Sequence, residues 1–270
     1  MSNFLKRTLS GFFFVVIIIA SIWISPYTFA LAFAIICGWA VFEFHKLTNQ
    51  QSQVQVVPLL SVVGAVILFI TSFLYASGKL IYPSFSVYGL FIVMVLVIEL
   101  YRKKENPIHN WAYFLLGQII IALPFSLLNF ILYVDGYHPL LLMAVFVTIW
   151  VNDTGAYLVG ITFGKHRLFE RISPKKSWEG FIGGAITALL SGFVFSLFIP
   201  EISLLSWLIF SEIVVIFGTF GDLLESLMKR TVHVKDSGDV IPGHGGLLDR
   251  FDSMLLVAPA IFIFLSFLFY

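Results

Sequence analysis

The segment from Lys229 to Ser253, KRTVHVKDSGDVIPGHGGLLDRFDS, concentrates charge, glycine and histidine in a chain that is otherwise largely apolar. Asp222 stands just before this segment, and Asp249 and Asp252 lie near its end. Magnesium is usually held by one or two carboxylates together with the phosphates of its substrate. The spacing therefore predicts a site for metal-assisted chemistry on a phosphate-bearing substrate, with Asp222 and Asp249 as the first pair of ligands and Asp252 as a third.

Cations accompany these carboxylates along the chain. Ser226, Lys229 and Arg230 follow Asp222 at spacings of four, seven and eight, so they share its face if the helix continues. Arg250 stands between the last two aspartates. A face that combines a hard oxygen ligand with cations is suited to binding phosphate groups.

The turn from Pro242 to Gly246 contains three glycines, which let backbone N–H groups approach an anion closely. We expect Gly245 and Gly246 to contact substrate in this way, and His244 to hydrogen-bond a phosphate. A lone histidine is more often structural, but the surrounding residues favour a functional role here. Carboxylates at Asp236 and Asp239 have weaker claims, because loop carboxylates are commonly solvated.

A second polar segment, Gly164 to Gly184, carries five basic residues and then a helix start, Ser-Trp-Glu-Gly. Ser177 is placed as the helix N-cap, with Glu179 in the first turn. A helix N-terminus beside Lys175 and Lys176 is suited to binding phosphate. The alternative is a basic loop that only touches anionic lipid headgroups.

Asp153 lies within a hydrophobic run, where a carboxylate is costly unless it is paired or faces water. Tyr157, Gly160 and Gly164 follow it at helical spacing and would share its face. The glycines of this stripe are predicted to let two helices pack closely. Two roles for Asp153 stay open at this point, an interhelical hydrogen bond and a contact with substrate.

The composition shows what must position these residues. Hydrophobic residues make up 59% of the chain and charged residues 11%, whereas charged residues make up roughly 25% of a soluble domain. The predicted fold is an all-α polytopic membrane protein, a bundle of about nine transmembrane helices. The predicted spans are Leu9 to Trp23, Tyr27 to Phe44, Val54 to Ala76, Tyr82 to Leu100, Trp111 to Tyr133, Pro139 to Phe163, Trp178 to Ile199, Ile202 to Leu224 and Phe251 to Phe269.

The basic residues predict the orientation of this bundle, because cytoplasmic loops retain Lys and Arg. With a cytoplasmic N-terminus and nine alternating spans, Lys79 is the only one of the 16 basic residues that falls outside. We therefore expect the N-terminus to be cytoplasmic and the C-terminus to be outside. The apolar pattern continues from the first run into a second, which favours an uncleaved first helix over a signal peptide.

Polar residues are unevenly distributed between the two halves of the chain. The first five spans contain few beyond Glu43, His45, Glu99 and Asn129, whereas most of the 15 acidic residues lie after position 150. Residues 1–135 are therefore predicted to be membrane scaffold, and residues 136–270 to be the catalytic region with two cytoplasmic loops. Cys37 is the only cysteine, which excludes an intrachain disulfide and a zinc site built from cysteines.

One long pattern, Ser-x2-Lys-Arg-x4-Lys-Asp-x5-Pro-Gly-His-Gly-Gly-x2-Asp-Arg-x-Asp, runs from Ser226 to Asp252. It closely resembles the signature of the phosphatidate cytidylyltransferases, also called CDP-diglyceride synthetases. The segments around Asp153 and from Ser173 to Gly180 also look like that family. Ser177 stands where many members have Thr, a change that keeps the hydroxyl.

The resemblance implies that CTP and phosphatidate give CDP-diacylglycerol and pyrophosphate, with help from Mg²⁺ and with a second cation left open. It implies a bacterial inner-membrane enzyme whose site faces the cytoplasm. Asp222 and Asp249 are assigned to the metal, with Asp252 as a third ligand or as a residue that orients its neighbours. The groups assigned to the triphosphate or the lipid phosphate are Lys175, Lys176, Lys229, Arg230 and Arg250.

Two other functions fit part of this pattern. A CTP-dependent kinase of a polyprenol-type membrane alcohol would need a base to activate a hydroxyl, and Asp153 or His244 could serve. An anion transporter would line a pathway with charges, but the polar residues gather on one face and no inverted repeat is evident. No nucleic-acid partner is expected, and whether the chain forms a homodimer stays open.

Overall fold

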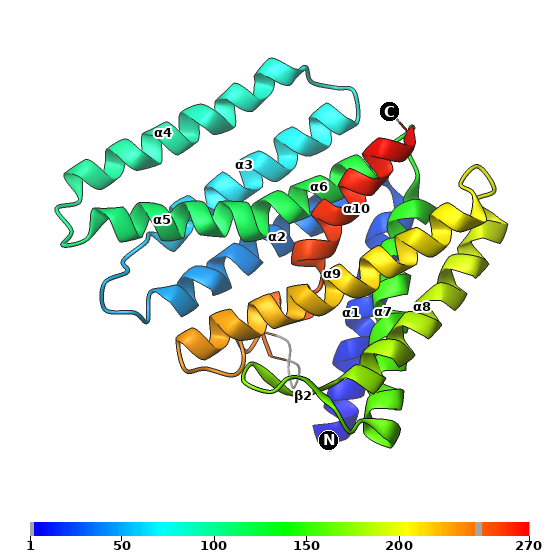
Figure 1. The fold of residues 1–270 in the computed structure, drawn as a ribbon. Coiled ribbons are helices and arrows are strands. Elements are labelled where there is room, and N and C mark those ends of the chain that lie inside the picture. The colour runs from blue at the N-terminus through cyan, green and yellow to red at the C-terminus, as the bar shows by residue number, and fades with distance from the viewer. Residues whose placement is uncertain (1–2, 241–244, 270) are drawn as a thin grey trace.

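The computed structural model describes residues 3–240 and 245–269. Within these residues the chain is helical apart from a two-stranded antiparallel hairpin (Figure 1). The predicted all-α class is confirmed. The elements are α1 (Asn3–Ile24), α2 (Pro26–Thr48), α3 (Pro58–Ala76), η1 (Tyr82–Ser84), α4 (Phe85–Tyr101), α5 (Pro107–Gly117), η2 (Gln118–Ala122), α6 (Leu123–Leu132), α7 (Pro139–Phe163), β1 (Arg167–Phe169), β2 (Ser173–Ser177), α8 (Trp178–Phe198), α9 (Leu204–Thr231), η3 (Leu248–Arg250) and α10 (Met254–Phe269).

Helix starts follow from local sequence signals. Proline occupies the first helical position of α2, α3, α5 and α7, where its missing N–H is not needed and its fixed φ suits the helix. Ser25 caps α2 by accepting a hydrogen bond from the Tyr27 N–H, and Ser203 caps α9 in the same way. Ser25 therefore separates α1 from α2.

The segments α5, η2 and α6 together form one apolar unit, Pro107–Leu132, which corresponds to the fifth predicted span, Trp111 to Tyr133, and begins four residues earlier. The middle of this unit is one turn of π-helix, Gln118–Ala122, followed by Pro124. Proline lacks an N–H and its ring crowds the carbonyl four residues earlier, so the preceding turn widens. This span is thus apolar along its whole length, but its α-helical geometry is interrupted by the π-turn.

Seven helical segments among the described residues are long and apolar enough to cross a membrane. Two shorter apolar helices, Leu9–Ile24 and Met254–Phe269, account for the first and last predicted spans. The chain is an integral membrane protein with several membrane-spanning helices. The count of nine crossings and the orientation of the two termini stay predictions.

Contacts between connections show which helix ends lie together. The Arg102 guanidinium, after α4, donates to the Gln55 carbonyl between α2 and α3 at 2.6 Å. At the other end of the bundle, Lys79 contacts Tyr27 at the start of α2. The α2–α3 and α4–α5 connections are therefore at the same end, away from Lys79. This arrangement agrees with the alternation inferred from the basic residues.

Helices α7 and α8 pack closely through small residues. Gly160 lies against Gly180, because a Cβ on Gly160 would be 3.7 Å from the Gly180 Cα. Gly184 approaches α7 so closely that a Cβ would be 3.0 Å from the Asn152 carbonyl oxygen. The predicted glycine packing stripe is confirmed. Tyr157, on the same predicted face, is 65% exposed and takes no part in this contact.

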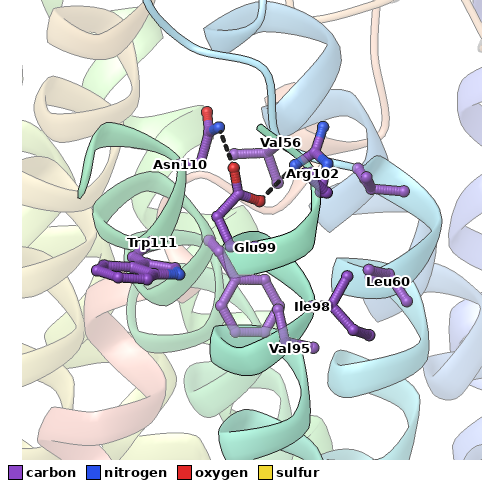
Figure 2. Close-up of a pocket in the computed structure, with 10 residues that line it drawn as sticks. Val56, Leu60, Val95, Ile98, Glu99, Arg102, Asn110 and Trp111 are labelled. Carbon is purple, nitrogen blue, oxygen red and sulfur yellow. Dashed lines mark hydrogen bonds and ion pairs between the residues drawn. The ribbon is translucent and has the colours of Figure 1, made fainter. Parts of the chain in front are cut away.

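A buried polar cluster joins α4, α5 and the α2–α3 connection (Figure 2). The Glu99 carboxylate, 7% exposed, accepts from Asn110 Nδ2 at 2.6 Å and pairs with Arg102 Nη1 at 2.6 Å. The Asn110 Oδ1 atom in turn accepts from the Gln55 N–H at 2.7 Å. Asn110 therefore links a buried charge to a backbone amide, and it holds α4, α5 and the α2–α3 connection together.

We predict that Asn110→Leu destabilises the protein without altering the residues of the polar cavity described below. The change leaves the Gln55 N–H and one Glu99 oxygen without their partner, at a cost of about 1–3 kcal/mol for each group. The apparent melting temperature in detergent should fall by several degrees, whereas Lys104→Ala, an exposed change nearby, should not move it. Equal melting temperatures for the two variants would contradict this role for Asn110.

Candidate functional site

A cavity of about 450 Å³ gathers part of the predicted site at one end of the bundle. In Figure 1 the hairpin lies between the N-terminal part of α1 and the C-terminal part of α9, in the lower part of the view. Its lining residues come from α1, α7, α9, the loop after α9 and the segment before α10. They are Gly11, Phe14, Val15, Trp150, Asp153, Asp222, Lys229, Asp236, Asp249, Arg250, Asp252 and Ser253.

Six of the predicted site residues line this cavity, namely Asp153, Asp222, Lys229, Asp249, Arg250 and Asp252. Asp153 thus faces the cavity, where Asn152 Nδ2 donates to its Oδ1 atom at 3.2 Å. The other described site residues lie around the cavity without lining it. Pro242, Gly243 and His244 lie outside the described residues.

Helix α9 continues to Thr231, so the condition for a shared face is met. Ser226 donates to Asp222 Oδ1 at 3.2 Å across one helical turn. Arg230 is exposed, and its guanidinium reaches the Val234 carbonyl at 3.4 Å. The end of α9 therefore presents Asp222 and Lys229 to the cavity, while Arg230 is directed to the loop that follows.

Asp222 and Asp252 lie beside each other because α9 makes a very close approach at Gly221. A Cβ at this position would be 2.6 Å from the Asp252 carbonyl oxygen and 2.8 Å from that of Ser253. Only glycine allows backbone to come this near. Asp252 is further held by the Ser253 N–H, which donates to Oδ1 at 2.7 Å.

Lys229 is the most tightly held cation of the site. Its ammonium lies 2.6 Å from Asp249 Oδ1 and 2.5 Å from Glu225 Oε2. The side chains of Lys229, Glu225 and Asp249 are 12%, 1% and 6% exposed. Buried charges are tolerated when they are paired in this way, since an unpaired one would cost several kcal/mol.

Asp249 joins three segments through its two carboxylate oxygens. Oδ1 contacts Lys229, and Oδ2 accepts from the backbone N–H groups of Ser237 at 2.9 Å and Gly246 at 2.8 Å. Burial raises the pKa of Asp249, but hydrogen bonds with Glu225, Lys229 and the Ser237 N–H together hold it below its ordinary value. Asp249 is therefore ionised, and its oxygens are already engaged by the protein.

The described part of the glycine turn contacts this same carboxylate. Gly245 has a φ of +83°, and a Cβ there would lie 2.7 Å from Asp249 Oδ2. Positive φ and the close approach both require glycine. The sequence predicts that the Gly246 N–H faces an anion, and here that anion is the protein's own Asp249.

The hairpin between α7 and α8 brings a further cation to the cavity. Lys176, in β2, pairs with Asp222 Oδ2 at 2.7 Å, whereas Lys175 is exposed. Ser177 is buried and accepts from the Gly180 N–H at 3.2 Å, which confirms it as the N-cap of α8. Glu179, in the first turn, accepts from the N–H groups of Lys165 and His166.

Among residues 3–240 and 245–269, no three His, Cys, Asp or Glu side chains converge on a common position for a metal ion. The acidic groups of the cavity are instead paired or spread along its wall. Such a wall suits Mg²⁺ bound through one or two carboxylates, with the remaining ligands from substrate phosphates and water.

The chain matches the model of the cytidylyltransferase family over residues 5–268. It belongs to this family. The phosphatidate cytidylyltransferase of Haemophilus influenzae is 33% identical over 290 residues, which cover 94% of this chain and 96% of that protein. That of Bacillus subtilis is 33% identical over 278 residues, covering 98% and 99%. That of Staphylococcus haemolyticus is 48% identical over 133 residues, covering 48% and 50%.

Cytidylyltransferases are nucleotidyltransferases, so the cavity belongs to an enzyme of that class. Two buried glutamates next to it were not assigned to the site from sequence. Glu225 stands four residues before Lys229 on α9, a spacing that favours ion pairs and could have revealed it. Glu43 is a carboxylate inside an apolar helix, which is a functional signal in itself.

We predict that Glu225→Leu lowers kcat of this cytidylyltransferase at least about tenfold, because a hydrogen bond to a charged group contributes about 1.5–3 kcal/mol. Leucine keeps much of the volume but offers no oxygen to the Lys229 ammonium, which Glu225 contacts at 2.5 Å. Glu212→Leu, a change on the same helix away from the cavity, is the matched control. The role assigned to Glu225 is wrong if both variants keep wild-type turnover.

Proposed function

We propose that this protein transfers the cytidylyl group of CTP to phosphatidate, giving CDP-diacylglycerol and pyrophosphate, at the cytoplasmic face of a bacterial inner membrane. The observation that supports this best is the cavity itself, in which carboxylates and cations meet at one end of an apolar bundle. Relatives aligned over almost the whole chain are phosphatidate cytidylyltransferases of bacteria. A polar cavity at the end of membrane helices can receive a soluble nucleotide and a lipid headgroup together.

The chemistry requires charge neutralisation more than proton transfer. An oxygen of the phosphatidate phosphate, already ionised near neutral pH, attacks the α-phosphorus of CTP. A new P–O bond forms, the bond between the α-phosphorus and the bridging oxygen breaks, and pyrophosphate leaves with the electron pair. No strong base is needed, and catalysis consists largely of positioning and electrostatic stabilisation.

The residues present fit a magnesium ion, which when bound would neutralise phosphate charge and polarise the reacting phosphoryl group. Asp249 remains a predicted ligand, but its two oxygens are held by the buried Lys229 and by two backbone amides, which a metal would have to displace. Asp222 is also contacted, by Ser226 at 3.2 Å and by Lys176 at 2.7 Å, but Lys176 is partly exposed and can turn to a substrate phosphate. Asp222 and Asp252 lie beside each other in the cavity wall. We therefore assign the metal to Asp222 and Asp252 first, and give Asp249 the task of holding Lys229 and the loop.

The cations of the cavity would bind the anionic groups of both substrates. Lys229 and Arg250 line the cavity, and Lys176 reaches its wall through Asp222. Lys175 and Arg230 are exposed nearby, where they suit a triphosphate or a lipid headgroup arriving from solvent or membrane. These groups spread positive charge along the wall that carries the aspartates.

We predict that the purified protein releases pyrophosphate from CTP and Mg²⁺ only when phosphatidate is supplied, with CDP-lipid formed in equal amount. A parallel sample in which an isoprenoid alcohol replaces phosphatidate is the control. Formation of CDP with the alcohol would assign the site to a CTP-dependent kinase. Folded protein that is silent with both lipids would count against nucleotidyl transfer and favour an anion transporter.

We predict that Asp252→Asn raises the Mg²⁺ concentration for half-maximal activity at least about tenfold, since loss of even an outer-shell group typically costs 10–100-fold in metal affinity. Asp249→Asn should instead lower kcat with a smaller change in the Mg²⁺ requirement. The comparison uses initial rates across a Mg²⁺ titration at saturating CTP. The opposite order of the two Mg²⁺ requirements would return Asp249 to the metal.

A further inference from the structure

We infer that Glu43, in α2, is a positioning residue of the transfer site, which it serves by clamping the loop that carries Asp249. The inference rests on the proposed function for the reaction concerned, but the clamp itself is a matter of geometry. Glu43 is 2% exposed and does not line the polar cavity. It acts through other residues, and it lies about 200 positions before them in the chain.

The Glu43 carboxylate accepts four hydrogen bonds. Oε1 accepts from Trp39 Nε1 at 3.1 Å and from the Leu247 N–H at 3.0 Å. Oε2 accepts from the Leu248 N–H at 2.8 Å and from Ser237 Oγ at 3.2 Å. Three of the four donors belong to the loop between α9 and α10, so a single side chain of α2 fixes both arms of that loop.

Losing these contacts would cost much free energy, because the Glu43 carboxylate is buried. A buried charge is stable only where enough donors surround it, and the four donors named above are neutral N–H or O–H groups. The dependence is mutual. The amides of Leu247 and Leu248 would otherwise face the protein interior without acceptors, and Leu248 is 1% exposed.

Glu43 and Asp249 divide the donors of the loop between them. The Ser237 N–H bonds Asp249 Oδ2 while its Oγ bonds Glu43 Oε2. The Gly246 N–H bonds Asp249, and the next two amides bond Glu43. Asp249 can meet Lys229 in its observed position only while both arms of the loop stay where Glu43 holds them.

Two loop glycines have their positions explained by this clamp. A Cβ on Gly238 would lie 2.5 Å from Glu43 Oε1, and one on Gly246 would lie 2.1 Å from Ser237 Oγ and 2.6 Å from Glu43 Oε2. Neither residue has a positive φ, so the requirement at these positions is space for the carboxylate and, at Gly246, for the Ser237 hydroxyl that bonds it. Gly246, which belongs to the glycine-rich signature, thus leaves room for the Glu43 carboxylate.

The test is Glu43→Gln, which keeps the shape but places an NH₂ group among donors. Glu99→Gln is the matched control, since Glu99 is also a buried carboxylate that accepts hydrogen bonds at a helix end far from the cavity. Three quantities are measured for each variant in detergent: the apparent melting temperature, kcat and KM per folded enzyme, and hydrogen exchange at the amides of Ser237, Leu247 and Leu248.

We expect Glu43→Gln to speed exchange at these three amides and to lower kcat per folded enzyme at least about tenfold, with a smaller effect on KM for CTP. Glu99→Gln should lower only the melting temperature. Wild-type exchange and wild-type kcat in Glu43→Gln would overturn the inference, as would equal kcat losses in both variants. If the wild-type protein lacks transfer activity, faster exchange still supports the clamp and only the proposed function fails.

Discussion

The constraint on which the site depends is the burial of carboxylates that must stay charged. Asp249 is ionised in a place where burial opposes ionisation, and it can be so only because a lysine and two backbone amides meet it. Each partner comes from a different segment. Satisfying this one group therefore fixes the end of α9, the start of the loop and the glycine turn relative to one another.

The apolar bundle makes this constraint stricter. Within hydrocarbon, polar groups cannot hydrogen-bond to water, so helices satisfy their backbone N–H and C=O groups internally. Small residues at the interfaces let these helices pack closely. Close approach at Gly221 lets α9 and the segment before α10 bring Asp222 and Asp252 together, and Asp153 of α7 lines the same cavity. The same packing that excludes lipid thus concentrates negative charge where a cation and phosphates can meet it.

Much of this could be predicted from sequence because it depends on local signals. Hydrophobic runs and prolines mark most helices, and the helix α7 begins and ends at the predicted Pro139 and Phe163. The Ser177 cap and the charged residues that line the cavity could also be predicted from short spacings. The contribution of Gly11 and Phe14 could not, because the sequence of an apolar helix does not indicate which residues it will pack against.

The contacts of Glu43 could not be predicted from the sequence, for a different reason. Its charge within an apolar helix indicates that donors must exist, but the donors lie in a loop that hydropathy and spacing do not connect with α2. The π-turn at Gln118–Ala122 is another such case, because Pro124 indicates a local distortion but not its form. Long-range pairing depends on packing of the whole bundle, which a single sequence does not display in any local pattern.

The pairing of Lys229 also limits what that residue can do for a substrate. An ammonium has three N–H donors, and contacts with Glu225 and Asp249 use two of them. Because Lys229 lines the cavity, the third donor is the one left for a phosphate. The ionised Asp249 already balances its charge, so Lys229 positions a phosphate more than it adds net attraction. Attraction must then come from other cations, and Lys176, which pairs with Asp222 at the cavity wall, is one of them.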